Sequence, residues 1–173
     1  MGILELRESL KDYARDAKLN LGSVLSPEGS PGLNEVQVYS IALACAYYTK
    51  QPRLIEEMTD ESAKRLPVEY IEAAKSAATI MAMNNIYYRF TYIVENKEIV
   101  KIPARLRMNV IAKPGIPKLD FELMCLAVSA LEGCVACVNI HVEQLTMLGL
   151  EGTQSAIRIA AVLNSTGQAL FIG

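Results

Sequence analysis

The chain's one histidine and two of its four cysteines lie within eight residues of each other, as Cys134, Cys137 and His141. Steps of three and four residues place side chains on the same face of an α-helix, so a helix over this stretch would bring the three groups together. Two thiols beside a titratable base suit reversible dithiol–disulfide chemistry, and the same groups could equally bind a metal ion. The spacing therefore predicts either a redox centre at 134–137 or a metal site.

The residues around Cys134 indicate that it stands at the beginning of a helix. Gly133 is typical of a helix end, so Cys134 would lie close to the unpaired N–H groups and the positive dipole end of the next helix. Such a position lowers the pKa of a thiol from about 8.5 by one to several units. His141 could take the proton of Cys137 or stand as imidazolium beside its thiolate, which favours Cys137 as the attacking sulfur. The thioredoxin pattern would instead favour Cys134, and both assignments stay open.

A histidine that moves protons needs a partner to fix its tautomer and orientation, and carboxylates commonly serve. Glu122 is the best candidate, because an antiparallel return of the chain after Gly133 would bring it level with His141. The same carboxylate, together with Cys134, Cys137 and His141, would also supply the four ligands of a zinc site. Alternatively, the two thiols are packed side chains without chemistry.

Composition favours packed helices over a sheet. The chain has 173 residues, of which 51% are hydrophobic and only 6% aromatic, with no tryptophan, so Ala, Leu, Ile, Val and Met must form the core. This length fits one domain, 1–173, of the all-α class. The apolar fraction exceeds what a small interior needs, so we expect a homo-oligomer. Cys45 and Cys125 lie in apolar stretches and are interpreted as buried, inert side chains.

Charge and hydropathy exclude several functional classes. A net charge of -2 and scattered Lys and Arg residues offer no field for phosphate backbones, so nucleic acid is not an expected partner. Glu5, Arg7 and Glu8 stand where a signal peptide would need an apolar core, and no apolar run is long enough to span a membrane. Four cysteines without an export signal indicate a reducing compartment, and we expect a cytoplasmic protein.

Apolar residues recur at helical spacing along most of the chain, and no stretch shows the alternation typical of a strand. Asn34 is a good cap for one helix and Pro52 a good first residue for another, and KPGIP at 113–117 is a turn. Asn84 and Asn85 are poor helix formers and predict a break inside 67–94. An offset of 50 residues aligns 72–91 with 122–141, a weak sign of internal duplication. The expected helices are 3–18, 35–49, one from Pro52, two within 67–94, 118–131, 135–148 and 153–170.

Several blocks in this order resemble the alkyl hydroperoxide reductase D (AhpD) family, within the carboxymuconolactone decarboxylase-like superfamily. They are KDYARDAKLNL at 11–21, MAMNNIYYR at 81–89, LRMNVIAKPGIPKLDFEL at 106–123, and the Cys-x-x-Cys-x-x-x-His motif. The resemblance covers nearly the whole chain. It implies an all-helical homotrimer in peroxide defence that reduces the peroxiredoxin AhpC and has weak direct alkyl hydroperoxidase activity.

The resemblance also implies an electron donor and residue roles. Electrons would come from the lipoyl group of dihydrolipoamide acyltransferase, which dihydrolipoamide dehydrogenase keeps reduced; the chain has no flavin, haem or nucleotide motif of its own. Cys137 would become the sulfenic acid, Cys134 would donate a proton and resolve the disulfide, and Glu122 with His141 would relay protons. Ala136 departs from the family pattern, in which a second histidine often precedes the second cysteine.

Two other hypotheses use the same residues differently. In the first, the cysteines and His141 form a non-enzymatic redox sensor or a zinc-stabilised interaction module. In the second, the chain is a decarboxylase related to AhpD only through the superfamily, and its activity would not depend on the thiols. Zinc content and sensitivity to thiol alkylation distinguish these from a dithiol peroxidase.

Overall fold

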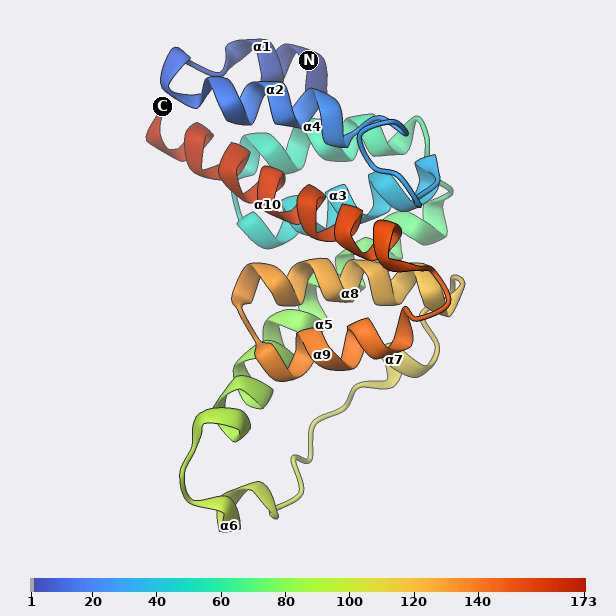
Figure 1. Ribbon diagram of the computed structural model, residues 1–173, viewed down its shortest axis with the longest axis vertical. Coiled ribbons are helices and arrows are strands. Elements are labelled where there is room, and N and C mark those ends of the chain that lie inside the picture. Colours follow the sequence, from blue (N-terminus) through green and yellow to red (C-terminus); the bar gives the residue numbers. More distant parts are fainter. Residues whose placement is uncertain (1) are drawn as a thin grey trace.

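Ten α-helices and one 3₁₀ helix, η1, form the fold over residues 2–173, the part of the chain that this computed structural model describes (Figure 1). No strand occurs in these residues, so the predicted all-α class is confirmed. The elements are α1 (Ile3–Ser9), η1 (Asp12–Ala14), α2 (Arg15–Val24), α3 (Glu35–Thr49), α4 (Pro52–Ala63), α5 (Val68–Ile93), α6 (Lys97–Val100), α7 (Asn109–Ala112), α8 (Lys118–Glu132), α9 (Val135–Gln144) and α10 (Leu150–Ile172).

Helices α3 and α8 form the centre of the molecule. Both are apolar around most of their circumference and are buried over ten consecutive residues, which are 37–46 in α3 and 120–129 in α8. Helix α8 contacts α3, α5, α9 and α10, so it is covered on all sides. In Figure 1, α9 lies on the side of α8 that faces away from α10. The cysteine-bearing helix therefore lies against the core rather than within it.

The N-terminal helix predicted for 3–18 is wrong. Helix α1 ends at Ser9, the backbone is extended at Leu10 and Lys11, and the chain resumes through η1 into α2. Leu10 is buried in a small cluster with Ala14, Ala17 and Ala169. The chain must turn after Ser9 to bury Leu10 against α10. The spacing of apolar residues in the sequence would by itself permit a continuous helix there.

The predicted break at Asn84 and Asn85 is also wrong, because α5 continues through both residues to Ile93. Both asparagines are buried, and the side-chain oxygen of Asn85 accepts a hydrogen bond of 2.9 Å from Ser129 on α8. Helix propensity disfavours each by well under 1 kcal/mol, a penalty that packing against α8 overrides. The first half of the suggested repeat therefore has no break, and the internal duplication stays a prediction.

Several local signals are confirmed. Asn34 and Gln37 form a reciprocal capping box at the start of α3, and Pro52 is the first residue of α4. Gly133 ends α8 in the left-handed conformation. Gly149 also has a positive φ of 86°, but with extended ψ, and it directly precedes α10. Helix α9 ends at Gln144, four residues earlier than predicted, and a turn leads from it to Gly149.

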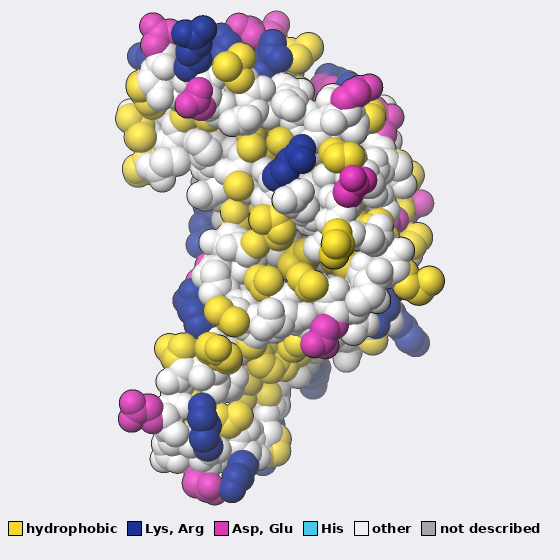
Figure 2. Space-filling view, viewed as in Figure 1, with side chains coloured by type: hydrophobic (Ala, Val, Ile, Leu, Met, Phe, Trp, Pro, Cys, Tyr) yellow, Lys and Arg dark blue, Asp and Glu magenta, His cyan; other side chains and the backbone are white. Residues whose placement is uncertain are grey.

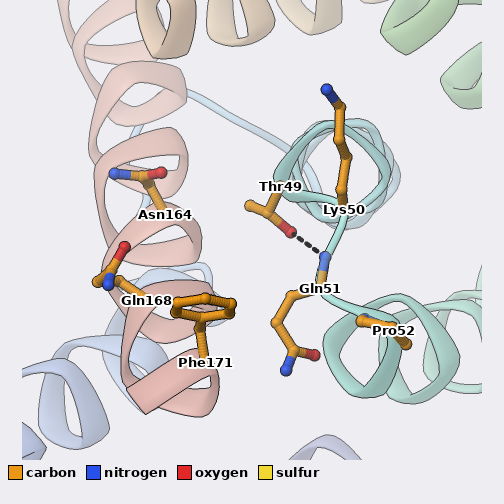
Figure 3. Close-up of a pocket in the computed structure, with 8 residues that line it drawn as sticks. Thr49, Lys50, Gln51, Pro52, Asn164, Gln168 and Phe171 are labelled. Carbon is orange, nitrogen blue, oxygen red and sulfur yellow. Dashed lines mark hydrogen bonds between the residues drawn. The ribbon is translucent and has the colours of Figure 1, made fainter.

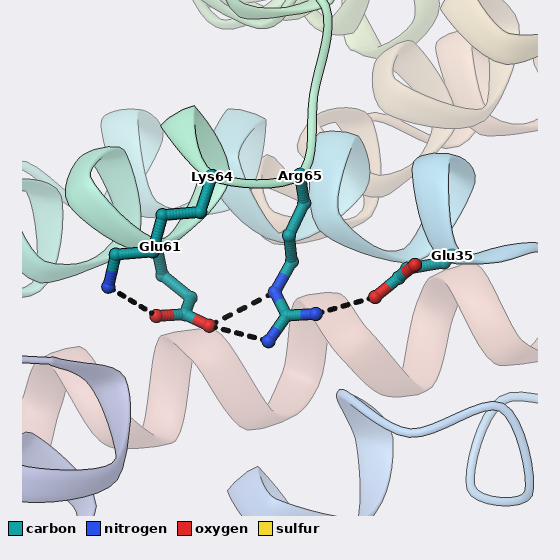
Figure 4. A network of polar contacts seen from close by, with 4 residues as sticks. All are labelled: Glu35, Glu61, Lys64 and Arg65. Atoms are coloured by element: carbon teal, nitrogen blue, oxygen red, sulfur yellow. Dashed lines mark hydrogen bonds and ion pairs between the residues drawn. The ribbon is translucent and has the colours of Figure 1, made fainter.

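Charged side chains join the end of α4 to the beginning of α3. Arg65 donates to Glu61 at 2.8 and 3.0 Å and to Glu35 at 2.6 Å, while Lys64 donates to the other oxygen of Glu61 (Figure 4). The hydrogen bonds from Arg65 hold the pKa of the Glu61 carboxyl below its usual value. Such pairs contribute little each, about 0 to 1 kcal/mol at a surface, so this network orients two helices rather than stabilising the fold strongly.

A thin arm projects from the helical body. It consists of the last turns of α5, the short helix α6 and the extended segment that leads to α7 (Figure 1). Tyr92, Ile93 and Ile102 on this arm are each more than half exposed. Figure 2 shows hydrophobic side chains gathered where the arm joins the body. The arm thus presents apolar surface that this single subunit does not cover.

A buried carboxylate fixes the beginning of α8. Asp120 accepts hydrogen bonds from the Gln37 amide of α3 at 2.8 Å and from the Tyr70 hydroxyl of α5 at 2.6 Å. Burial and the bond to Asp120 raise the pKa of Tyr70 to about 12. Because Asp120 lies two residues before Glu122, these bonds also set the position of that side chain.

We expect Asp120→Ala to lower the free energy of unfolding by about 3 kcal/mol, because it leaves the Gln37 and Tyr70 donors without their charged partner. Tyr70→Phe removes one bond and leaves the carboxylate paired with Gln37, so it should lower stability by only about 1 kcal/mol. Urea denaturation of the two variants and the wild type measures both effects. Equal stability of Asp120→Ala and wild type would contradict this account of α8.

Candidate active site

A tight turn between α8 and α9 positions Cys134. Gly133 has φ 71° and ψ 29°, a left-handed conformation that side chains with a Cβ rarely adopt. Cys134 is the N-cap residue of α9, and its sulfur accepts a hydrogen bond of 3.3 Å from the backbone N–H of Cys137. The predicted placement of Cys134 at a helix start is therefore confirmed. An N–H points at the sulfur where negative charge would develop if Cys134 became a thiolate.

Cys137 lies one turn inside α9 and is 4% exposed, while Cys134 is fully buried. Both are free thiols, and the Cys137 thiol donates to the backbone oxygen of Asn84 at 3.9 Å. Two effects raise the pKa of Cys137 to about 12: burial, which is the larger, and the interaction with Cys134. The sequence predicted that the surroundings of Cys137 would activate its thiol. In this subunit burial has the opposite effect, because it raises the pKa of the thiol. Loss of water around the sulfur outweighs the favourable backbone N–H.

His141 and Glu122 form a buried pair across the two helices. The Nδ1 atom of His141 lies 2.6 Å from Oε2 of Glu122, and both side chains are less than a tenth exposed. The contact predicted between them is present, because the turn at Gly133 returns α9 antiparallel to α8. With Glu122 accepting from Nδ1, the ring nitrogen that could exchange protons with other groups is Nε2.

No hydrogen bond within residues 2–173 joins that second nitrogen to either cysteine. Nε2 of His141 lies 3.3 Å from the sulfur of Met81, and the hydrogen bonds found for His141 in the described part of the chain lead to Glu122 and Met81. Cys137 and His141 lie on the same face of α9, but their side chains bind other partners. Any proton that passes between them must therefore travel through a molecule in the space beside both.

A cavity of about 280 Å³ provides this space, and its wall is mostly apolar. Cys137, His141 and Glu122 all line it, whereas Cys134 does not. The sequence did not identify Asn84 as a wall residue, and it assigned Met81 to packing alone. The one signal that could have indicated Asn84 was a pair of amide side chains inside an apolar helical run. The lining residues are Met81, Asn84, Tyr88, Met108, Ile111, Lys118, Glu122, Cys137, Ile140, His141 and Gln144.

Three side chains hold the end of α8 next to the cysteine turn. Arg89 of α5 pairs with the Glu132 carboxylate at 2.9 Å and also donates to the Glu132 backbone oxygen at 2.9 Å. The Tyr48 hydroxyl of α3 donates to the second carboxylate oxygen. Glu132 directly precedes Gly133, so this network ties the turn to two other helices.

Other candidate groups lie outside this arrangement. Cys45 and Cys125 are fully buried, and burial raises the pKa of both thiols, as expected for inert side chains. Over residues 2–173, no three His, Cys, Asp or Glu side chains converge as metal ligands would, so the zinc hypothesis gains no support from geometry.

A larger cavity of about 460 Å³ lies between α10 and the turn from α3 to α4 (Figure 3). Its wall is formed by Lys50, by side-chain amides such as Asn164 and Gln168, and by Phe171. It contains no thiol, imidazole or carboxylate. The smaller cavity is therefore the better candidate for a reaction site.

The chain is similar to known proteins over nearly its whole length. Residues 97–171, which include the whole α8–α9 hairpin, match the carboxymuconolactone decarboxylase family. An alkyl hydroperoxide reductase AhpD from Coxiella burnetii is 48% identical over 168 residues, covering 96% of this chain and 95% of the relative. Proteins of the same name from Bradyrhizobium sp. and Streptomyces griseus are 44% and 42% identical over 172 residues, covering 98% of this chain and 93% and 96% of the relatives.

These matches define the class first, as the carboxymuconolactone decarboxylase-like superfamily. Within it, identity above 40% over nearly the full length of both chains shows that the protein belongs to the AhpD family. The resemblance drawn from the sequence blocks is therefore confirmed. Separately, no helix within 2–173 is both long enough and apolar enough to cross a membrane.

We expect iodoacetamide to alkylate reduced Cys137 at a rate that climbs continuously from about pH 7 to about pH 11, because only the thiolate reacts and its pKa is about 12. A small free thiol, by contrast, should level off above about pH 9. Mass spectrometry of the Cys137 peptide follows the reaction, with the Cys45 and Cys125 peptides expected to stay unmodified in folded protein. If the rate for Cys137 levels off below about pH 9, burial does not raise the pKa of this thiol.

Proposed function

We propose that the protein is a dithiol alkyl hydroperoxide reductase that cycles between reduced Cys134 and Cys137 and their disulfide. The observation that carries this proposal is the arrangement of the α8–α9 hairpin. It presents Cys137 to a cavity beside the His141–Glu122 pair and keeps Cys134 one helical turn away, with an N–H on its sulfur. The name shared by the relatives supports the same activity.

In the peroxide half-reaction, Cys137 gives up its proton and its sulfur attacks the distal oxygen of a hydroperoxide. The O–O bond breaks, the alkoxide takes a proton and leaves as an alcohol, and Cys137 becomes a sulfenic acid. Because no hydrogen bond joins His141 to Cys137 in residues 2–173, the proton passes through the hydroperoxide or a water molecule in the cavity. Cys134 then attacks the sulfenic sulfur, which forms the disulfide and releases water.

Two electrons must then return to the disulfide. In the proposal they come from a dihydrolipoyl group, borne by dihydrolipoamide acyltransferase and kept reduced by dihydrolipoamide dehydrogenase, through thiol–disulfide exchange. The reduced pair can also reduce a disulfide of the peroxiredoxin AhpC. No bound cofactor is required by this cycle. Membership of the AhpD family supports these donors and partners, which also fit a reducing cytoplasm.

Ala136 affects how the cycle handles protons. It lies half-buried between the two cysteines and offers no titratable group where a second histidine was expected. His141 with Glu122 is therefore the proton relay on which the proposal rests.

The proposed assembly is a homotrimer. Tyr92, Ile93 and Ile102 expose apolar surface on the arm, and burying such surface between subunits would stabilise an oligomer. The trimeric number comes from the family resemblance, and sedimentation equilibrium measures it directly.

We expect peroxide consumption driven by dihydrolipoamide to fall to background in both Cys134→Ser and Cys137→Ser. Each variant lacks one sulfur of the disulfide, so neither can complete the cycle. Cys45→Ser, which changes a buried thiol away from the cavity, is the matched control and should retain turnover. Turnover that survives alkylation of both active thiols would instead support a thiol-independent enzyme such as a decarboxylase. A disulfide that forms but never turns over, or stoichiometric zinc, would support the sensor or zinc module.

We expect Glu122→Gln to lower kcat/KM for hydroperoxide by about 100-fold, because a neutral amide cannot stabilise protonated His141. Glu143→Gln is the control, since Glu143 is an exposed carboxylate on the same helix as His141. Steady-state kinetics of both variants, with folding checked by circular dichroism, provide the comparison. If Glu122→Gln keeps kcat/KM within about twofold of wild type, the proton relay is not part of the reaction.

A further inference from the structure

Asn84 carries a polar group that the fold does not satisfy. Its side chain is 4% exposed, and its Oδ1 atom is buried without a hydrogen-bond partner. A buried acceptor left unpaired destabilises a protein by about 1 to 3 kcal/mol. Asn84 is also a poor helix former in the middle of the long helix α5. Neither helix formation nor packing explains an asparagine here.

The position of Asn84 indicates what could pair with it. Asn84 is one of the residues that line the cavity beside Cys137, and its backbone oxygen is 3.9 Å from the Cys137 sulfur. A ligand that enters this cavity and pairs with Oδ1 would therefore bring a hydrogen-bond donor to the side of the cavity where Cys137 lies. Met108, Ile111 and Ile140 line the same cavity and offer no hydrogen bonds to the rest of such a ligand.

We propose that Asn84 binds the hydroperoxide group of an organic substrate, and that Met108, Ile111 and Ile140 contact its apolar part. This inference rests on the proposed peroxidase function and names a substrate-binding residue for it. The terminal O–H of the hydroperoxide donates to Oδ1 of Asn84, which holds the distal oxygen beside the sulfur of Cys137. Holding the two reacting atoms in the correct orientation contributes a large part of the rate enhancement that enzymes achieve.

The chemical step balances with the groups in the cavity. Cys137, as thiolate, forms a bond to the distal oxygen while the O–O bond breaks and its electron pair goes to the proximal oxygen. That alkoxide takes the proton released by Cys137, by way of His141, and leaves as an alcohol. The sulfur is oxidised to sulfenic acid, and the hydroperoxide is reduced.

The electron donor is a weaker match for this position. A dihydrolipoyl group reaches a disulfide with a sulfur atom, which is a weak hydrogen-bonding group, and its amide lies at the far end of an aliphatic chain. It would leave Oδ1 of Asn84 without a strong donor near Cys137. A hydroperoxide, in contrast, places an O–H directly at the atom under attack.

The test replaces Asn84 by leucine, which has a similar shape without polar atoms. Because Asn84→Leu removes an unpaired buried acceptor, we expect its stability in urea to equal or exceed that of wild type. We expect its second-order rate constant for oxidation by cumene hydroperoxide to fall at least about tenfold, a loss typical of one hydrogen bond to a reacting group. Sulfenic acid at Cys137, trapped in a Cys134→Ser background without electron donor, is measured by mass spectrometry.

Two controls separate binding from general damage. Asn85→Ala removes the neighbouring buried amide, which does not line the cavity, so it should lower stability and leave the oxidation rate within about twofold. Alkylation of Cys137 by iodoacetamide should be unchanged in Asn84→Leu, because the thiol itself is intact. Ile140→Ser, at a half-exposed wall residue, should slow cumene hydroperoxide more than hydrogen peroxide.

The outcomes distinguish this inference from the proposed function. If wild-type Cys137 is not oxidised by any hydroperoxide, the proposed function fails. If wild type reacts and Asn84→Leu reacts equally fast, the role of Asn84 is refuted and the function stands. A variant with normal oxidation but a raised KM for dihydrolipoamide would assign the cavity to the electron donor and overturn the inference.

Discussion

Helix α8 is buried over ten consecutive residues, so each polar side chain within that stretch needs a partner on another helix. Asp120 is bound by Gln37 and Tyr70, Glu122 by His141, and Ser129 by Asn85. A buried carboxylate without such a partner would be strongly destabilising. These requirements set the positions of α3, α5 and α9 around α8, and the pairing of Glu122 brings His141 to the wall of the cavity.

The same burial governs the thiols. Cys45, Cys125 and Cys137 all lie out of water with raised pKa values, yet only Cys137 borders a cavity that also holds a titratable base. Burial of the Cys137 sulfur raises its pKa and so favours the protonated thiol. Cys134 differs, because it caps a helix and receives a backbone N–H. In the proposed cycle the two cysteines take different steps, Cys137 as the attacking sulfur and Cys134 as the resolving one.

Two neighbouring residues of α5 carry unpaired polar atoms, and one of them, Asn84, lines the cavity. Asn84 and Asn85 lie in the middle of α5, and each has one side-chain atom that is buried and unpaired. Local sequence preference and the fold disagree at this point, which is where function is most often found. The wall is mostly apolar, so the cavity combines a few polar groups near the sulfur with a hydrophobic surface for the rest of a ligand.

Composition and periodicity alone determined the all-α class, and single residues determined several boundaries, such as the capping box at Asn34 and the left-handed turn at Gly133. The same spacing placed Cys134, Cys137 and His141 on one helix and suggested Glu122 as the partner of His141. Only the tertiary structure decided the rest, including the break at Leu10, the unbroken course of α5, the direction of the Cys137 pKa shift and the contact between His141 and Met81. Spacing fixes which side chains share a helix face, whereas desolvation and side-chain pairing depend on which other helices cover that face.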